Sequence, residues 1–220
     1  MINKNILSQI LAYWKEELIG LIIFLLCISL ALFFPASGSL QKFSNVFFFL
    51  FLLPFLYIRF ILKKDLRDFG FNLRNKKNGF LWAGAMLGVS LLIIFILVRF
   101  FEFQNHYFLP AYIATRFGAF LFYELVLVNF IFFLQEFFFK GFFLFTLEKK
   151  LGFISFFVQA VLFTIFIILA QSFAWQIAPF VILSLTGGIV AYKSKSFIYA
   201  YLMGLVFLII LDSYIIYLFK

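Results

Sequence analysis

Seven long apolar runs constrain this chain more than any other feature of its sequence. They lie at 18–34, 44–62, 79–101, 118–147, 153–172, 177–192 and 196–219. A membrane-spanning helix needs about 20 apolar residues, so each run spans a bilayer or nearly so. Of the 220 residues, 66% are hydrophobic and 12% are charged, whereas soluble domains are about 45–50% apolar and about 25% charged. We therefore exclude a water-soluble globular fold and expect an all-α polytopic transmembrane bundle of about seven spans, within a range of six to eight, in a single domain at 1–220.

The positions of the basic residues predict how the chain crosses the membrane. Twelve Lys and Arg residues lie at the N-terminus or in the alternate connections at 63–78, 149–150 and 193–195, and four lie at the opposite ends of the runs, namely Lys42, Arg99, Arg116 and Lys220. By the positive-inside rule, the basic connections and the N-terminus face the cytoplasm. The net charge of +9 therefore reports topology, and we expect the lipid bilayer and no nucleic acid as a partner. The sequence predicts a multi-pass protein of the cell membrane.

Four ionisable residues interrupt the apolar runs, at Glu124, Glu136, Lys140 and Asp212. An ionisable group in the hydrocarbon region costs several kcal/mol or needs a partner, so each residue is a hypothesis for a functional site. Glu136 and Lys140 are four residues apart on one predicted helix, with the acid on the N-terminal side, which is the favourable order for an ion pair. A purely structural pair and a role in a site explain this spacing equally well.

The run at 118–147 also carries a polar stripe. Gln135 precedes Glu136, and Glu124 lies eleven residues before Gln135, which is almost three helical turns. Asn129 falls on the adjoining part of the same face. A polar stripe on a membrane helix faces the bundle interior or a water-filled cavity. Because the run has about 30 residues, we expect it to tilt, kink or extend past the cytoplasmic face.

The remaining candidate residues favour structural roles. His106 is the only histidine, so a His-based zinc site cannot be assembled from this chain, and its place in a predicted loop favours a solvated side chain. Cys27 is the only cysteine, so it cannot form an intrachain disulfide and is either a core or a lipid-facing residue. The glycine pair at 187–188 favours a close helix contact or a kink over a ligand cradle.

The stretch at 135–143, with Gln135-Glu136, three phenylalanines and then Lys140-Gly141, is followed by a basic turn that ends in Leu151-Gly152. This pattern resembles the first signature of the CAAX-protease and bacteriocin-processing (CPBP) family of intramembrane metalloproteases, also called the abortive-infection family. That signature has a pair of glutamates, three residues and Arg-Gly, before a basic turn ending in Leu-Gly. The segment at 66–71 resembles the amphipathic segment that precedes the family's core helices. The resemblance implies a CPBP-like core at about 60–215 with the CAAX-protease fold.

The departures from this family pattern fall on its catalytic residues. The glutamate that activates water falls on Gln135, and a neutral amide cannot act as a general base. The second glutamate is kept as Glu136, and the arginine is replaced by Lys140. Phe163 matches the phenylalanine of the second signature, but the family's two histidines and its asparagine are replaced by residues without ligating groups. These replacements are Ile167, Gly204 and Leu208. We therefore expect the family's metal site to be lost, with no metal and no cofactor.

Three further polar residues lie near the predicted catalytic axis, toward its outer side. Gln171 is one turn beyond Ile167, Asp212 is two turns beyond Gly204, and Glu124 lies at comparable depth. Our hypothesis is that Glu124, Gln171 and Asp212 line an interior polar cluster that binds a substrate. The alternative is that Asp212 lies at an outer interface in contact with water.

These observations lead to three functional hypotheses. The preferred one is an inactive CPBP homologue that binds a membrane peptide, a lipidated tail or a partner protein in the membrane. The second is a working intramembrane endopeptidase of the CAAX type that relies on Glu136 and water. The third is an ion- or proton-coupled transporter that uses the acidic stripe, although the sequence has no duplicated halves and no paired interrupted helices.

Overall fold

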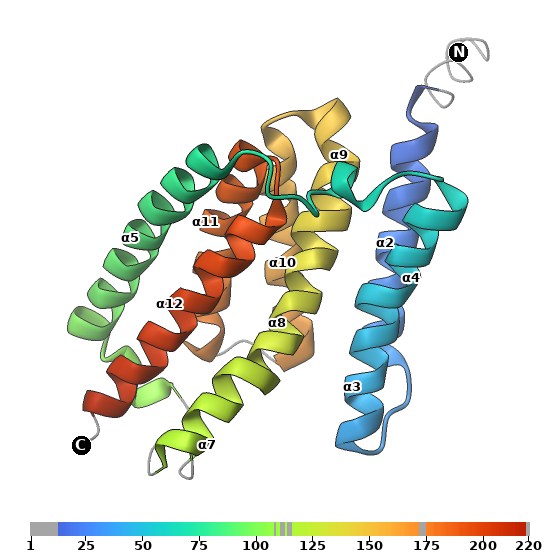
Figure 1. Ribbon diagram of the computed structural model, residues 1–220. Coiled ribbons are helices and arrows are strands. Elements are labelled where there is room, and N and C mark those ends of the chain that lie inside the picture. Colours follow the sequence, from blue (N-terminus) through green and yellow to red (C-terminus); the bar gives the residue numbers. More distant parts are fainter. Residues whose placement is uncertain (1–12, 108, 111–112, 114–115, 172–174, 219–220) are drawn as a thin grey trace, which may run out of the picture.

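The chain forms a bundle of helices in the computed structural model (Figure 1). The structure describes residues 13–107, 109–110, 113, 116–171 and 175–218. Every regular element in this part of the chain is helical. The predicted fold class, an all-α polytopic membrane bundle, is confirmed.

Six stretches of the described chain are long and apolar enough to cross a membrane. They are Lys15–Phe33, Ser39–Ile61, Lys76–Phe101, Phe117–Leu151, Trp175–Ser194 and Phe197–Leu218. A shorter apolar helix, α10 (Ile154–Gln171), follows the fourth stretch in sequence and precedes the fifth. It runs through the bundle (Figure 1). The seven predicted runs correspond to these seven helical stretches.

Four of the stretches consist mainly of one α-helix each, which are α2 (Lys15–Phe33), α5 (Lys76–Phe101), α11 (Ala178–Ser194) and α12 (Phe197–Leu218). Three short 3₁₀ turns lie between stretches or at their ends, namely η3 (Leu66–Phe69), η4 (Phe103–His106) and η7 (Trp175–Ile177).

The other two stretches alternate between α-helix and the wider π-helix. The second stretch consists of α3 (Ser39–Phe47), η1 (Phe48–Leu52), α4 (Leu53–Leu56) and η2 (Tyr57–Ile61). The fourth consists of α7 (Phe117–Phe122), η5 (Tyr123–Val128), α8 (Asn129–Glu136), η6 (Phe137–Phe143) and α9 (Leu144–Leu151). With 35 residues, this fourth stretch extends past the predicted run at its C-terminal end.

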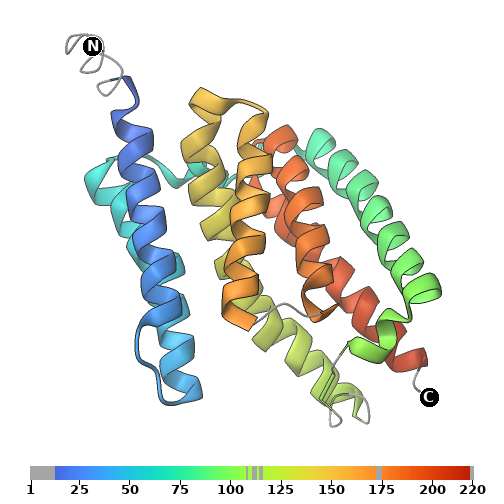
Figure 2. The same ribbon diagram turned by 180° about the vertical axis from the view of Figure 1, so that it is seen from behind.

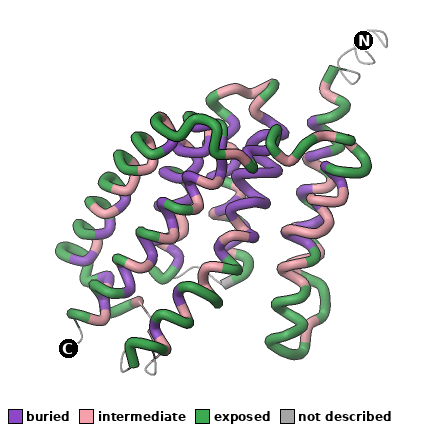
Figure 3. The backbone as a smooth tube through the Cα atoms, in the orientation of Figure 1, coloured by how far each residue is buried: buried purple, intermediate pink, exposed green. Residues whose placement is uncertain are grey.

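The central helices form the core of the bundle. Figures 1 and 2 show α5 at one edge and the hairpin of α2 with α3–η2 at the other, with α8–α9, α10, α11 and α12 between them. Buried positions are concentrated on the central helices, whereas α5 is exposed along most of its length (Figure 3). Large apolar side chains such as Ile22, Phe80 and Phe157 are exposed on the outer faces. Helices that are apolar on all sides are suited to lipid contact on those faces.

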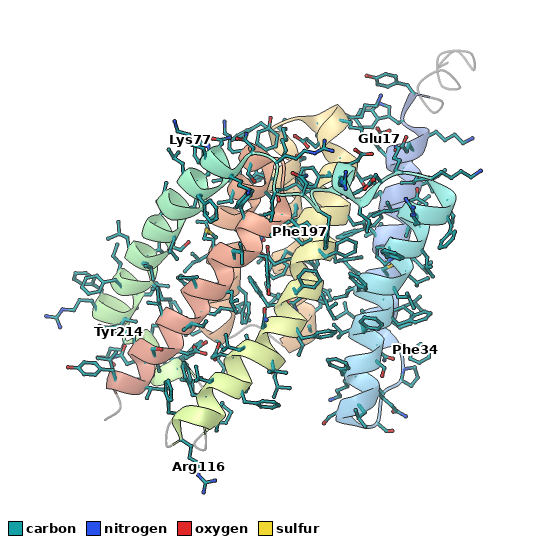
Figure 4. The ribbon with its side chains drawn as sticks, viewed as in Figure 1. Glu17, Phe34, Lys77, Arg116, Phe197 and Tyr214 are labelled. Atoms are coloured by element: carbon teal, nitrogen blue, oxygen red, sulfur yellow. The ribbon has the colours of Figure 1, made fainter. Side chains whose placement is uncertain are left out.

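The two ends of the bundle differ in charge. One end, which we call the basic end, contains the connection at 62–75 and the turns at 152–153 and 195–196, while the opposite end, which we call the far end, contains the connections at 34–38 and 102–116. Figure 4 shows Lys77 at the basic end and Arg116 and Tyr214 at the far end. The chain enters α2 at the basic end and leaves α12 at the far end, as an odd number of crossings requires.

The connection at the basic end is bound to the turn between α11 and α12. Asn72 Nδ2 donates to the carbonyl of Lys195 at 3.0 Å, and Asn78 Nδ2 donates to the carbonyl of Lys193 at 3.0 Å. Ser196 Oγ donates to the carbonyl of Gly70 at 3.1 Å. Gly70 has a φ of +77°, and a Cβ there would overlap the ring of Phe145. The connection is therefore a packed part of the fold.

Candidate functional site

A buried ion pair lies where α8 passes into η6. Lys140 Nζ donates to Glu136 Oε1, and the two residues are 2% and 3% exposed. The predicted self-neutralising pair is therefore present. The other oxygen, Glu136 Oε2, has no hydrogen-bond partner among the described residues.

Lys140 reaches this position because α11 presents a glycine to it. A Cβ at Gly187 would lie 2.5 Å from Lys140 Nζ and 2.9 Å from its Cε. The adjacent Gly188 faces α10, where a Cβ would lie 2.9 Å from Gln159 Oε1. The predicted close helix contact at this glycine pair is confirmed, since each glycine makes room for a polar side chain of a neighbouring helix.

Phenylalanine rings enclose the ion pair. Every residue of η6 is buried. The ring of Phe24 on α2 stacks on Phe138, with 4.9 Å between centroids, and on Phe143, with 3.8 Å. Such aromatic contacts stabilise the packing beyond the area that they bury. The η6 phenylalanines therefore tie α2 to the centre of the bundle.

Four positions match the family's catalytic residues and form what we call the predicted catalytic axis, namely Glu136, Ile167, Gly204 and Leu208. Glu136 lies on α8, and the other three lie on α10 and α12, which pack against α8 or η6. Ile167, Gly204 and Leu208 are buried, and a Cβ at Gly204 would overlap the ring of Phe132. Apolar side chains therefore fill the surroundings of these positions. Gln135, the match to the family's first glutamate, is only half-buried.

Aromatic contacts also fill the side of the axis toward α10. Phe139 contacts Phe163 and Phe166, with ring centroids 4.9 Å and 5.4 Å apart. Glu136 is the only carboxylate, imidazole or amide side chain among the four axis positions, and Lys140 occupies one of its oxygens. These residues do not fit the metal of the CPBP family. In the described part of the chain, no three His, Cys, Asp or Glu side chains gather in one place.

A second acidic site lies nearer the far end. Glu124 on η5 and Asp212 on α12 are near enough for their carboxyl groups to interact, and neither oxygen of Glu124 has a hydrogen-bond donor among the described residues. We call these two residues the carboxyl pair. Their exposed fractions are 0% and 4%. Glu124 and Asp212 are both buried in the interior, and the side chain of Gln171, the third predicted member, lies outside the described residues. The substrate-binding cluster of these three residues stays a prediction.

Tyr107 is the member of this cluster that sequence reasoning missed. Its hydroxyl donates to Asp212 Oδ1 at 2.7 Å. Burial raises the pKa of this hydroxyl, and the neighbouring carboxyls of Asp212 and Glu124 raise it further. Tyr107 is therefore a stable hydrogen-bond donor. No signal in the sequence marks it, because it lies in a connection without helical periodicity.

The predicted polar stripe faces the bundle interior through Glu124, Asn129 and Glu136. Tyr201 on α12 donates to Asn129 Oδ1, and Asn129 Nδ2 donates to the carbonyl of Leu125 at 3.1 Å. Asn129 therefore links the fourth stretch to α12 between the two acidic sites.

His106 and Cys27 take no part in either acidic site. His106 is exposed, as predicted, and its ring stacks near Trp175 with 6.5 Å between centroids. Cys27 is fully buried in the core, which decides between the two predicted positions for it.

Three surface hollows lie outside these sites. One, of about 550 Å³, is an apolar groove lined by Leu30, Phe34, Phe43, Ser44, Asn45, Phe47, Phe48 and Phe49. We call it the hairpin groove, because α2 and α3–η1 form it. A hollow of about 260 Å³ lies between α10 and α11 and includes Thr164. A third of about 290 Å³ lies at the far end, lined partly by Arg99, Gln104 and Tyr214.

Comparison with known proteins found no match: no family model, no curated protein and no solved structure matches this chain. The resemblance to the CPBP family therefore stays a prediction from the motif residues. The structure shows a polytopic helical membrane bundle with two buried acidic sites.

Proposed function

We propose that this protein is a binding protein of the cell membrane that retains a CPBP-like helical core without its protease chemistry. The basic end faces the cytoplasm in this proposal, as the positive-inside rule requires. The observation that carries the proposal is the Glu136–Lys140 ion pair. The single acid kept from the family's catalytic set is held by an internal cation inside an apolar core.

Peptide hydrolysis needs a base that can reach a water molecule. A general base must lie within hydrogen-bond distance of the proton that it removes. Glu136 is 3% exposed and bonded to Lys140, and the half-buried neighbour Gln135 carries a neutral amide. This arrangement supports a structural role for Glu136 over a catalytic one.

The hairpin groove supports an apolar ligand. Its volume of about 550 Å³ falls within the range of about 300–1,000 Å³ that is usual for ligand pockets. Its lining is almost entirely phenylalanine and leucine, with Ser44 and Asn45 as the polar residues. Because aromatic side chains fill the predicted catalytic axis, the groove is the better place for a lipidated tail.

Photocrosslinking in proteoliposomes tests this binding role. A farnesylated peptide with a diazirine in its prenyl chain should label residues 43–49. Ser44→Trp, which fills the groove from an exposed position, should reduce labelling severalfold. Thr164→Trp, which fills the hollow between α10 and α11, is the matched control and should leave labelling unchanged. Equal labelling of wild type and Ser44→Trp would refute the proposal.

The endopeptidase hypothesis makes a different prediction for the same peptide. We expect no cleavage by wild-type protein in proteoliposomes. Cleavage by wild type that is absent in Glu136→Gln would establish the protease instead. The double variant Glu136→Gln/Lys140→Met serves as the control for folding, because it removes both buried charges together.

A further inference from the structure

The carboxyl pair has no compensating positive charge among the described residues. Neither Glu124 nor Asp212 forms an ion pair. Glu124 lies seven residues after the start of α7, about 10 Å inside the helix at 1.5 Å per residue. Two negative charges this close, and this far from water, would repel each other strongly.

The hydrogen bonds show how the pair avoids this repulsion. Neither oxygen of Glu124 receives a hydrogen bond from an N–H or O–H donor in the described residues. A hydrogen bond between the two carboxyl groups therefore requires a proton carried by one of them, because ionised carboxylates only accept. Tyr107 donates to Asp212 and so favours the anion on Asp212. The geometry leaves Glu124 as the carrier of the proton.

The other ionisable groups around the pair do not supply a positive charge. Tyr107 and Tyr123 contribute hydroxyl groups near it. From α5 and the connection that follows, Arg99, Glu102 and His106 are exposed at the far end, and Arg116 before α7 is also exposed.

We propose that Glu124 and Asp212 form a proton-binding site that holds one exchangeable proton, and that Tyr107 links this site to the connection at the far end. Loss of the proton leaves two carboxylates in contact, so η5 and α12 separate and the Tyr107 hydrogen bond is strained. The proposal is independent of the ligand in the hairpin groove.

Infrared difference spectroscopy of the full chain in lipid nanodiscs tests the proposal directly. Protonated carboxyl groups have a carbonyl band that carboxylates lack. Wild-type protein at neutral pH should show one such band that disappears in alkaline buffer. Glu124→Gln should remove it, because the amide donates to the Asp212 anion, and Asp212→Asn should keep it up to higher pH, because Glu124 then has no neighbouring carboxylate. Glu102→Gln, an exposed acid at the same end, should retain the band of the wild-type protein. Tyr107→Phe should shift the band without removing it.

The pH dependence of unfolding gives a second readout. Where the folded pair holds one proton more than the unfolded chain, the folding equilibrium constant should fall about tenfold for each unit rise in pH. Glu124→Gln, whose amide can donate to Asp212 without a proton, should lose this dependence. Absence of the band in wild-type protein, or its persistence in Glu124→Gln, would overturn the proposal. So would the same pH dependence in wild type and Glu124→Gln.

Discussion

The two acidic sites lie on the same helical stretch and differ in how their charge is neutralised. Glu136 is matched by Lys140, one turn along its own helix. Glu124 faces a second acid on another helix. The Glu136–Lys140 pair lies within five residues of sequence, whereas the second site exists only when η5, α12 and Tyr107 meet. The environment of Glu136 is therefore set by its own helix, whereas the environment of Glu124 depends on how the helices pack together.

Both acids lie at π-helical segments. Glu124 is within η5, and Glu136 directly precedes η6. π-Helical turns are rare in proteins overall, but those that occur are often found at functional sites. Such a turn changes which side chains face a neighbouring helix. The same backbone feature therefore lies at a closed ion pair and at the proposed proton-binding site.

Breaking the ion pair should have the largest effect. Lys140→Met leaves the Glu136 charge buried without a partner, which should lower the free energy of unfolding by about 3–5 kcal/mol. Adding Glu136→Gln should restore most of the loss in a detergent unfolding titration. Asp212→Asn, the corresponding change at the other site, should cost much less. A single variant as stable as the double one would contradict this account.

Crowding Lys140 should have the next largest effect. Gly187→Ala places a methyl group 2.5 Å from Lys140 Nζ and should cost about 1–3 kcal/mol through overpacking. Gly84→Ala is the control, since a Cβ there meets nothing within 4 Å, and it should be neutral or slightly stabilising. Equal stability of the two alanine variants would show that the Gly187 contact is not restrictive.

Removing the Tyr107 hydroxyl should have a smaller effect that sharpens the comparison. Tyr107→Phe should cost about 1 kcal/mol, as side-chain hydrogen bonds in membrane proteins do. The loss should shrink as pH rises, because ionisation of both carboxyl groups strains the hydrogen bond from Tyr107 to Asp212. Thermal unfolding across pH measures both effects. A loss that is constant with pH would separate Tyr107 from the carboxyl pair.

The smallest effect should come from the lysines at the basic end. Burial lowers the pKa of Lys64 to about 8, and Lys149 lowers it further, although Glu16 forms an ion pair with Lys64. The folded chain then binds fewer protons than the unfolded chain between about pH 8 and 10.5, so stability rises with pH across that window. Lys149→Gln should reduce this rise by a few tenths of a kcal/mol. Unfolding at pH 7 and pH 10 measures the difference.

The local parts of this structure could be predicted from the sequence. The spans follow from the length of the apolar runs, and the Glu136–Lys140 pair follows from helical spacing. The interior direction of Glu124 also follows from the cost of burying an acid in lipid. Each of these predictions needs only one helix and the solvent around it.

The tertiary parts could not be predicted. Nothing near Gly187 in the sequence shows that its missing side chain makes room for Lys140, because the two residues lie on different helices. Tyr107 was missed because it lies in a connection without helical periodicity, 105 residues before its partner Asp212. The wider turns of η5 and η6 were also not predicted, because an uninterrupted apolar run has no periodicity that distinguishes a π-helix from an α-helix.

The connection at the basic end affects how the protein is made. Its hydrogen bonds join Gly70 to Ser196 and Leu73 to Tyr199, each 126 residues apart in sequence. A ribosome delivers the first three spans to the membrane long before it has synthesised the partners that hold this connection. Contacts of such high sequence separation form late and slowly. The early spans must therefore wait in the bilayer with this end open, and completion of α12 is the step that closes it.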